Sequence, residues 1–135
     1  MKTFTVGLII ATAVVAQTSA PQLDFETYRT KVEPVFLKKR PTHARCIVCH
    51  EGARTALQLL PLDNGQTTWT LEQSRKNFEA VQRVVNVKNP MASPLLKHPL
   101  AQEAGGDDFH SGGRQFTSQS DAEWKAMADW IKGAK

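Results

Sequence analysis

The chain has little of what identifies most functional classes. Its 135 residues contain only two cysteines and one tyrosine. Two cysteines are too few for the disulfide framework of many small secreted domains, and too few for a structural zinc site built on two cysteine pairs. The sequence also has no internal repeats, no low-complexity stretch and no basic run interleaved with aromatic residues, the pattern typical of nucleic-acid binding. We therefore expect no nucleic-acid partner.

Long apolar segments are missing as well. The longest uncharged, mostly apolar run covers residues 4–16, shorter than the roughly 20 residues that a membrane-spanning helix needs. It follows the positively charged Lys2 and precedes small residues at 18–20 that fit a signal-peptidase site. These features predict a signal peptide over residues 1–20 and a single domain over residues 21–135. We expect a periplasmic or otherwise exported protein, with no membrane insertion after signal cleavage.

The net charge is small. The chain has 17 Lys and Arg against 13 Asp and Glu, a formal charge of +4, and loss of Lys2 with the signal lowers it to about +3. A mildly basic surface fits transient contact with acidic protein partners, although a charge of this size does not by itself define a partner.

The two cysteines stand in one C-x-x-C-H motif, Cys46-Ile47-Val48-Cys49-His50. This motif is the attachment site of a c-type haem. On a helical turn, the two thiols can each add to one vinyl group of the porphyrin, and the histidine that follows lies under the iron. The motif therefore predicts one covalent haem c, with Cys46 and Cys49 as its thioether residues and His50 as the proximal iron ligand.

Other uses of two cysteines explain the motif less well. A redox-active C-x-x-C normally lies in a βαβ unit, and no strand pattern leads into Cys46. A structural zinc site needs four ligands. A disulfide would form in an oxidising compartment but would leave His50 unexplained.

Apolar periodicity and capping signals predict a helical chain. Residues 24–39 form a first helix capped by Asp24, in which Pro34 introduces a kink or a break. A short helix ended by Gly52 carries the motif. Residues 70–87 form another helix, opened by a capping box and with Leu71 on its buried face. One turn is expected over 93–97, and a last helix begins after Ser120 or Asp121 and runs to about Lys132. Between these elements, residues 54–68 read as a loop or a short hairpin, and residues 105–113 as a glycine-rich loop.

The motif and the helix order together resemble a class I cytochrome c. The resemblance covers most of residues 21–135 and implies an all-α, cytochrome c-like fold of three to five helices around one covalently attached haem. In that family the first and last helices pack across each other through small and aromatic residues.

The second half of the chain is more narrowly similar to small haem domains of environmental bacteria such as planctomycetes and acidobacteria. The similarity lies in three stretches: Ser93-Pro94-Leu95-Leu96, His110-Ser111-Gly112-Gly113 followed by Phe116, and Trp124 to Gly133. In those domains the histidine of the His-x-Gly-Gly loop looks like the distal iron ligand.

The sixth ligand of the iron must come from a Met or His downstream of the motif. His110 lies among four glycines, which let the backbone approach a flat macrocycle, and it matches the loop histidine of the related domains. Met91 follows a proline in the position usual for a class I ligand, and His98 lies in an exposed stretch. Met127 belongs to the apolar stripe of the last helix. We favour His110, with Met91 and then His98 as alternatives.

These features predict single-electron transfer rather than enzymatic catalysis. No nucleophile and base are arranged for chemistry, and a haem with two protein ligands transfers an electron with little rearrangement. Transient redox proteins, or the other subunits of a complex, would be the partners, and the oligomeric state is open. Two alternatives remain: a peroxidase-like enzyme or gas-binding protein with a labile distal site, and a haem subunit of a larger respiratory or photosynthetic complex.

Overall fold

The computed structural model describes residues 22–52 and 55–133, and the expected signal peptide lies outside them. Within these ranges the chain is helical and contains no β-strand, only two isolated bridges, which confirms the expected all-α class. The helical segments are α1 (Phe25–Thr27), the π-helical turn η1 (Tyr28–Val32), α2 (Glu33–Leu37), α3 (Cys46–His50), α4 (Leu71–Gln82), the 3₁₀ turn η2 (Pro90–Ala92), α5 (Pro94–Lys97), the 3₁₀ turn η3 (Gln102–Ala104) and α6 (Ala122–Ile131). None of them is long and apolar enough to cross a membrane.

The first helix forms as three joined segments, α1, η1 and α2. The Asp24 side chain caps its start by accepting a hydrogen bond of 2.7 Å from the Thr27 amide. The middle segment is π-helical and lies just before Pro34, which has no N–H to donate and crowds the preceding turn of an α-helix. The kink or break expected at Pro34 is therefore accommodated by one wider, π-helical turn before the proline. The helix ends at Leu37, two residues earlier than expected.

Helix α4 begins with the expected capping box, in which Thr70 and Gln73 bond reciprocally. It ends at Gln82 rather than at residue 87. Past this end, Asn86 takes part in local hydrogen bonds: its amide donates to the Ser93 hydroxyl, and its side chain accepts from the amides of residues 88 and 89. The placement of Leu71 on the buried face was wrong, because Leu71 is exposed.

The core forms where the first helix, α4 and α6 meet. Tyr28 lies between Phe78 and Trp130, with ring centroids 5.2 and 5.6 Å away. The Trp130 indole N–H donates to the Asp24 carbonyl at 2.9 Å and so joins the two ends of the described chain. The expected stripe of α6 is buried and consists of Trp124, Met127, Ala128 and Ile131.

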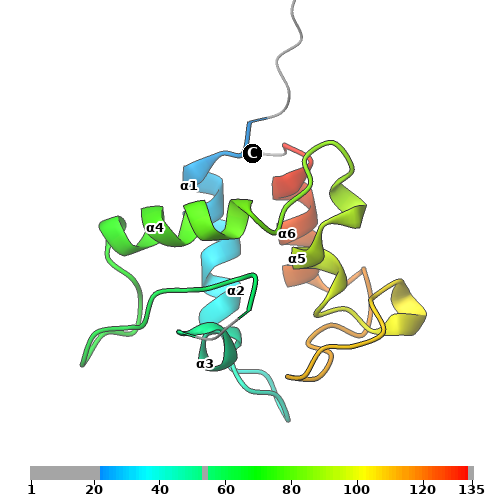
Figure 1. Ribbon diagram of the computed structural model, residues 1–135, viewed down its shortest axis with the longest axis horizontal. Helices are drawn as coiled ribbons and strands as arrows, with labels where there is room; N and C mark the ends of the chain where they lie inside the picture. Colours follow the sequence, from blue (N-terminus) through cyan, green and yellow to red (C-terminus); the bar gives the residue numbers. More distant parts are fainter. Residues whose placement is uncertain (1–21, 53–54, 134–135) are drawn as a thin grey trace, which may run out of the picture.

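One end of the molecule consists of short helical turns and loops rather than long packed helices. Figure 1 shows the first helix and α6 running side by side, with α4 lying across the first helix at the end where the described chain starts and stops. At the opposite end, α3 faces the orange loop that precedes α6. No regular helix fills the space between them, and this is where the candidate site lies.

Candidate functional site

The C-x-x-C-H motif forms a helical turn of its own, α3. Ile47 is buried and fixes the turn against the core, whereas the next residue, Val48, is exposed. This orientation directs Cys46, Cys49 and His50 to a common cavity, which all three line. The spacing of the motif therefore produces the shared face that haem attachment requires.

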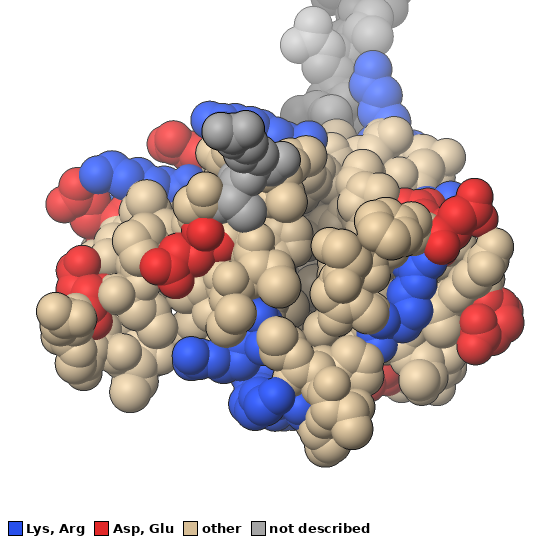
Figure 2. Space-filling view, turned by 60° about the horizontal axis from the view of Figure 1, so that its bottom comes forward, with Lys and Arg blue, Asp and Glu red and all other residues tan. Residues whose placement is uncertain are grey.

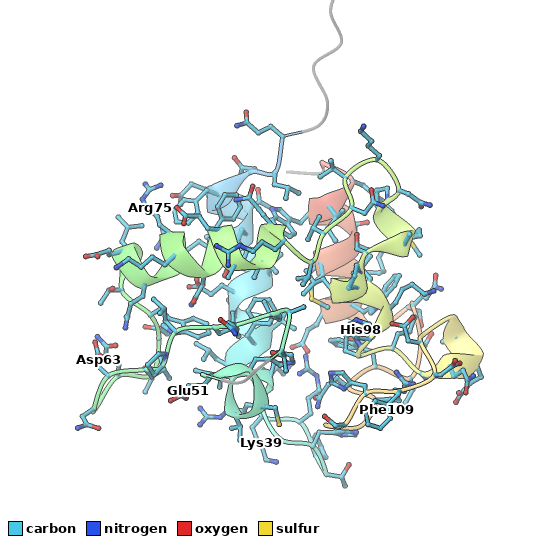
Figure 3. All side chains as sticks on the ribbon, in the orientation of Figure 1. Lys39, Glu51, Asp63, Arg75, His98 and Phe109 are labelled. Atoms are coloured by element: carbon cyan, nitrogen blue, oxygen red, sulfur yellow. The ribbon has the colours of Figure 1, made fainter. Side chains whose placement is uncertain are left out.

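The cavity has a volume of about 300 Å³ and a mainly apolar wall. It is bounded by the motif on one side and by α5 with the glycine-rich loop on the other. Figure 3 shows Lys39 and Glu51 with the first of these walls, and His98 and Phe109 with the second. The apolar side chains of the wall are Val35, Phe36, Leu57, Val84, Leu95, Phe109, Phe116 and Met127. A cavity of this kind suits a mostly apolar group that a few polar side chains hold in place.

His50 is held by its Nδ1 atom. That nitrogen lies 2.9 Å from the Leu57 carbonyl oxygen and 3.2 Å from the Thr55 hydroxyl. Because a carbonyl only accepts, Nδ1 carries the proton, and Nε2 keeps its lone pair. This is how metal-binding histidines are oriented in proteins, by a hydrogen bond from the other ring nitrogen.

His110 is held in the same way from the opposite wall. Its Nδ1 atom donates to the Gly113 carbonyl at 2.6 Å, which leaves Nε2 with a lone pair. The loop reaches this shape because Gly113 has a φ of +78°, a conformation that favours glycine. A Cβ on Gly112 would lie 3.5 Å from His110 Cε1 and 3.9 Å from Cys49 Sγ, so the loop passes close to the motif.

The pKa of His110 is lowered, chiefly by burial and further by the neighbouring His50, His98 and Arg114; the bond to Gly113 opposes the shift. A lowered pKa keeps the imidazole neutral at physiological pH. Only the neutral imidazole can bind a metal ion, so His110 is poised as a ligand.

His50 and His110 both line the cavity, and the distance between their imidazole rings suits one metal ion. Their ring centroids are 6.2 Å apart, and their planes differ by 23°. An imidazole nitrogen binds a transition metal at about 2.0 Å, and the ring centroid lies about 1 Å behind it, so two trans imidazoles have centroids about 6 Å apart. In separation and in donor type, His50 and His110 therefore fit two histidine ligands of one iron.

The other expected ligand candidates are placed less favourably. His98 lines the cavity, but its Nδ1 atom contacts the Asp107 carboxylate. The Arg114 guanidinium donates to the backbone carbonyls of both His98 and Asp107. Met91 is 39% exposed and lies outside the set of described residues that line the cavity. Met127 is buried in the core, as its position in the stripe predicted, although it also contributes to the cavity wall.

The two thiols differ in their surroundings. Cys49 is exposed, whereas Cys46 is half-buried, with its Sγ 4.0 Å from the Val35 carbonyl oxygen. Burial raises the pKa of the Cys46 thiol, and the guanidinium of Arg40 opposes this effect. Both cysteines lie in the described part of the chain, and no disulfide joins them there.

Several residues of the site carry no signal in the sequence. Leu57 and Gly113 act through backbone carbonyls, which any residue supplies. Arg40 reads as one of three consecutive basic residues at the end of a helix, yet it is buried beside the cavity. Phe109 reads as an ordinary loop residue, yet it is 77% exposed at the mouth of the cavity.

Comparison of the chain with protein families, with curated proteins and with solved structures finds no match. Across residues 22–52 and 55–133, no group of three or more His, Cys, Asp or Glu side chains is arranged to hold a metal ion by itself.

Proposed function

We propose that this chain is a monohaem c-type cytochrome with a cytochrome c-like fold, which transfers single electrons. One observation carries the proposal: His50 and His110 line the same apolar cavity, each is held through Nδ1, and their ring centroids lie 6.2 Å apart. The cysteines of the motif line the same cavity.

Each functional residue would have one task in holding the haem. The thiols of Cys46 and Cys49 would add to the two vinyl groups, and this covalent link fixes the macrocycle in the cavity. His50 would be the proximal ligand and His110 the distal ligand. The bound haem would supply the exchange of one electron between ferric and ferrous iron.

The way the histidines are held favours electron transfer over catalysis. Both imidazoles are anchored to backbone carbonyls, so neither needs to move between oxidation states. Small rearrangement is what an electron carrier requires, whereas an enzyme or a gas-binding protein needs an open or labile iron position. Two histidine ligands also favour a lower reduction potential than one histidine with one methionine, because thioether sulfur stabilises ferrous iron.

A redox partner would dock at the mouth of the cavity. Phe109 is exposed there, Val48 is exposed on the motif helix, and Lys39 and Arg45 are exposed on the same end of the molecule. Figure 2 shows Lys and Arg atoms on this face beside its hollowed centre, with most Asp and Glu atoms towards the periphery. A small apolar patch near basic groups suits a transient contact with an acidic redox protein. We place this encounter in the periplasm or another exported compartment.

The attachment is tested by producing the chain in a host that exports and matures c-type cytochromes. The haem absorbance should remain with the polypeptide after denaturation, and the mass should rise by one haem. Cys46→Ala with Cys49→Ala should abolish covalent attachment, and the exposed Ser111→Ala serves as the control. Haem that extracts into acidified organic solvent, or a chain that never acquires haem, would contradict the proposal.

A further inference from the structure

Arg40 is a buried cation beside the candidate haem cavity. It follows α2 on the way to the motif, and only 8% of its surface is exposed. Its guanidinium stacks on the Phe116 ring, 4.7 Å from the centroid, and bonds to the Glu123 carboxylate at the start of α6. Its Nη1 atom is buried and has no hydrogen-bond partner within the described part of the chain.

Two neighbours of Arg40 belong to the cavity wall. Phe116 and Cys46 both line the cavity, and the Arg40 guanidinium lies over the Phe116 ring and interacts with the Cys46 side chain. The charge is therefore in contact with two residues of the cavity wall, one of them a proposed thioether position. Water screens such a charge weakly, because the group is buried.

Glu123 does not cancel this charge at the cavity. Its carboxylate also binds Lys38 at 2.5 Å, so two cations share one anion. The pKa of the Cys46 thiol reports the balance: burial raises it most, Arg40 lowers it, and the opposing effect of Glu123 is the smallest of the contributions. Arg40, Lys38 and Glu123 together thus produce a positive potential at the cavity wall.

We propose that Arg40 raises the reduction potential of the haem through its buried charge, and that Glu123 opposes it. The inference rests on the proposed function. Reduction transfers one electron from a partner to ferric iron, so the net charge of the site falls by one. A nearby buried cation stabilises the less positive, ferrous form.

The test is a redox titration of the haem, followed by its absorbance, for matched variants. Arg40→Gln should lower the midpoint potential, and Glu123→Gln should raise it. Arg40→Lys keeps the charge and should stay close to the unchanged protein. The control is Lys38→Gln, which removes the other cation bound to Glu123; its side chain is 61% exposed, against 21% for Glu123, so the shift should be small and should vanish with added salt.

Shifts of opposite sign for Arg40→Gln and Glu123→Gln that persist at high salt would support the inference. Equal potentials, or shifts of the same sign, would overturn it while the haem spectrum stays unchanged. A failed proposed function gives a different result, namely no covalent haem in any variant. Should Arg40→Gln not accumulate, the comparison of Glu123→Gln with Arg40→Lys decides the question, because only the first changes the charge.

Discussion

At the scale of single residues, His110 determines whether the iron would be closed or open to small ligands. Its Nδ1 atom is engaged by the Gly113 carbonyl, so Nε2 is the nitrogen left to bind a metal, and the residue lines the cavity. His98 is the other described histidine on that wall, and it is engaged by Asp107. The distal ligand therefore depends on one side chain and on the loop that presents it.

Replacing His110 should open the iron. His110→Ala should convert a low-spin ferric spectrum into a high-spin one, and the ferrous form should then bind carbon monoxide. His98→Ala and Met91→Ala are the matched controls and should leave the low-spin spectrum unchanged. A high-spin spectrum in either control, with His110→Ala still low-spin, would show that His110 is not the distal ligand.

A second residue of interest is Glu33, whose carboxylate is buried between the first helix and α4. The Ser74 hydroxyl donates to its Oε1 atom at 2.8 Å, and the Tyr28 hydroxyl interacts with the same carboxylate. Burial raises the pKa of Glu33, and the bond from Ser74 opposes this only in part. The folded chain thus retains a proton that the unfolded chain loses.

This raised pKa makes stability fall with increasing pH. The contribution is fully present below the ordinary pKa of Glu and is lost as the pH rises through the folded value, because the unfolded state binds fewer protons there. Glu33→Gln should therefore raise the free energy of unfolding at neutral pH and change it little near pH ~4. Denaturant titrations across this range measure the difference. A Glu33→Gln variant that is no more stable than the unchanged protein at neutral pH would contradict this prediction.

At the scale of elements, the start of α4 is fixed by side chains rather than by packing. Thr70 accepts from the Gln73 amide at 3.2 Å, and the Gln73 side chain accepts from the Thr70 amide at 2.9 Å. Thr70→Ala should lower the free energy of unfolding by about 1 kcal/mol, measured by denaturant titration. Thr68→Ala, at an exposed position nearby, should have almost no effect. Equal losses for the two variants would show that the capping box contributes nothing specific.

The glycine-rich loop depends on close backbone contact. A Cβ on Gly106 would lie 1.9 Å from the Leu100 carbonyl oxygen, and other backbone atoms lie within 3.0 Å. Gly106→Ala should therefore displace the loop that carries His110 and cost roughly 2 kcal/mol or more. Chemical denaturation and the fraction of low-spin haem would both report it. Full stability together with an unchanged spectrum would refute the role given to this contact.

The sequence predicted those features of the fold that depend on residues close together in the chain, and missed those that depend on distant ones. The motif, the caps at Asp24 and Thr70 and the stripe of α6 depend on neighbouring residues, and the sequence predicted them. The end of α4 depends on Asn86 and Ser93, which bond across a loop, and the prediction was too long. Leu71, the first residue of α4, is exposed, whereas the polar Ser74 and Asn77 are buried on this helix and bond to distant partners. The carbonyls that hold His50 and His110 had no signal in the sequence.

At the scale of the whole molecule, the elements divide into a packed end and an open end. The first helix, α4 and α6 meet around Tyr28, Phe78 and Trp130, and this core joins the two ends of the described chain. At the other end, short elements and loops bring the motif and His110 to opposite sides of a cavity (Figure 1). We infer that the packed end holds the site rigid while the open end meets the partner.

The most direct test of this account is the absorption spectrum of the exported protein, recorded as ferric, then ferrous, then ferrous with carbon monoxide. With two histidines as the proposed ligands, the spectrum should be low-spin in both oxidation states and carbon monoxide should not change it. A high-spin ferric spectrum, or ready binding of carbon monoxide, would contradict it and point instead to a peroxidase-like enzyme or a gas-binding protein.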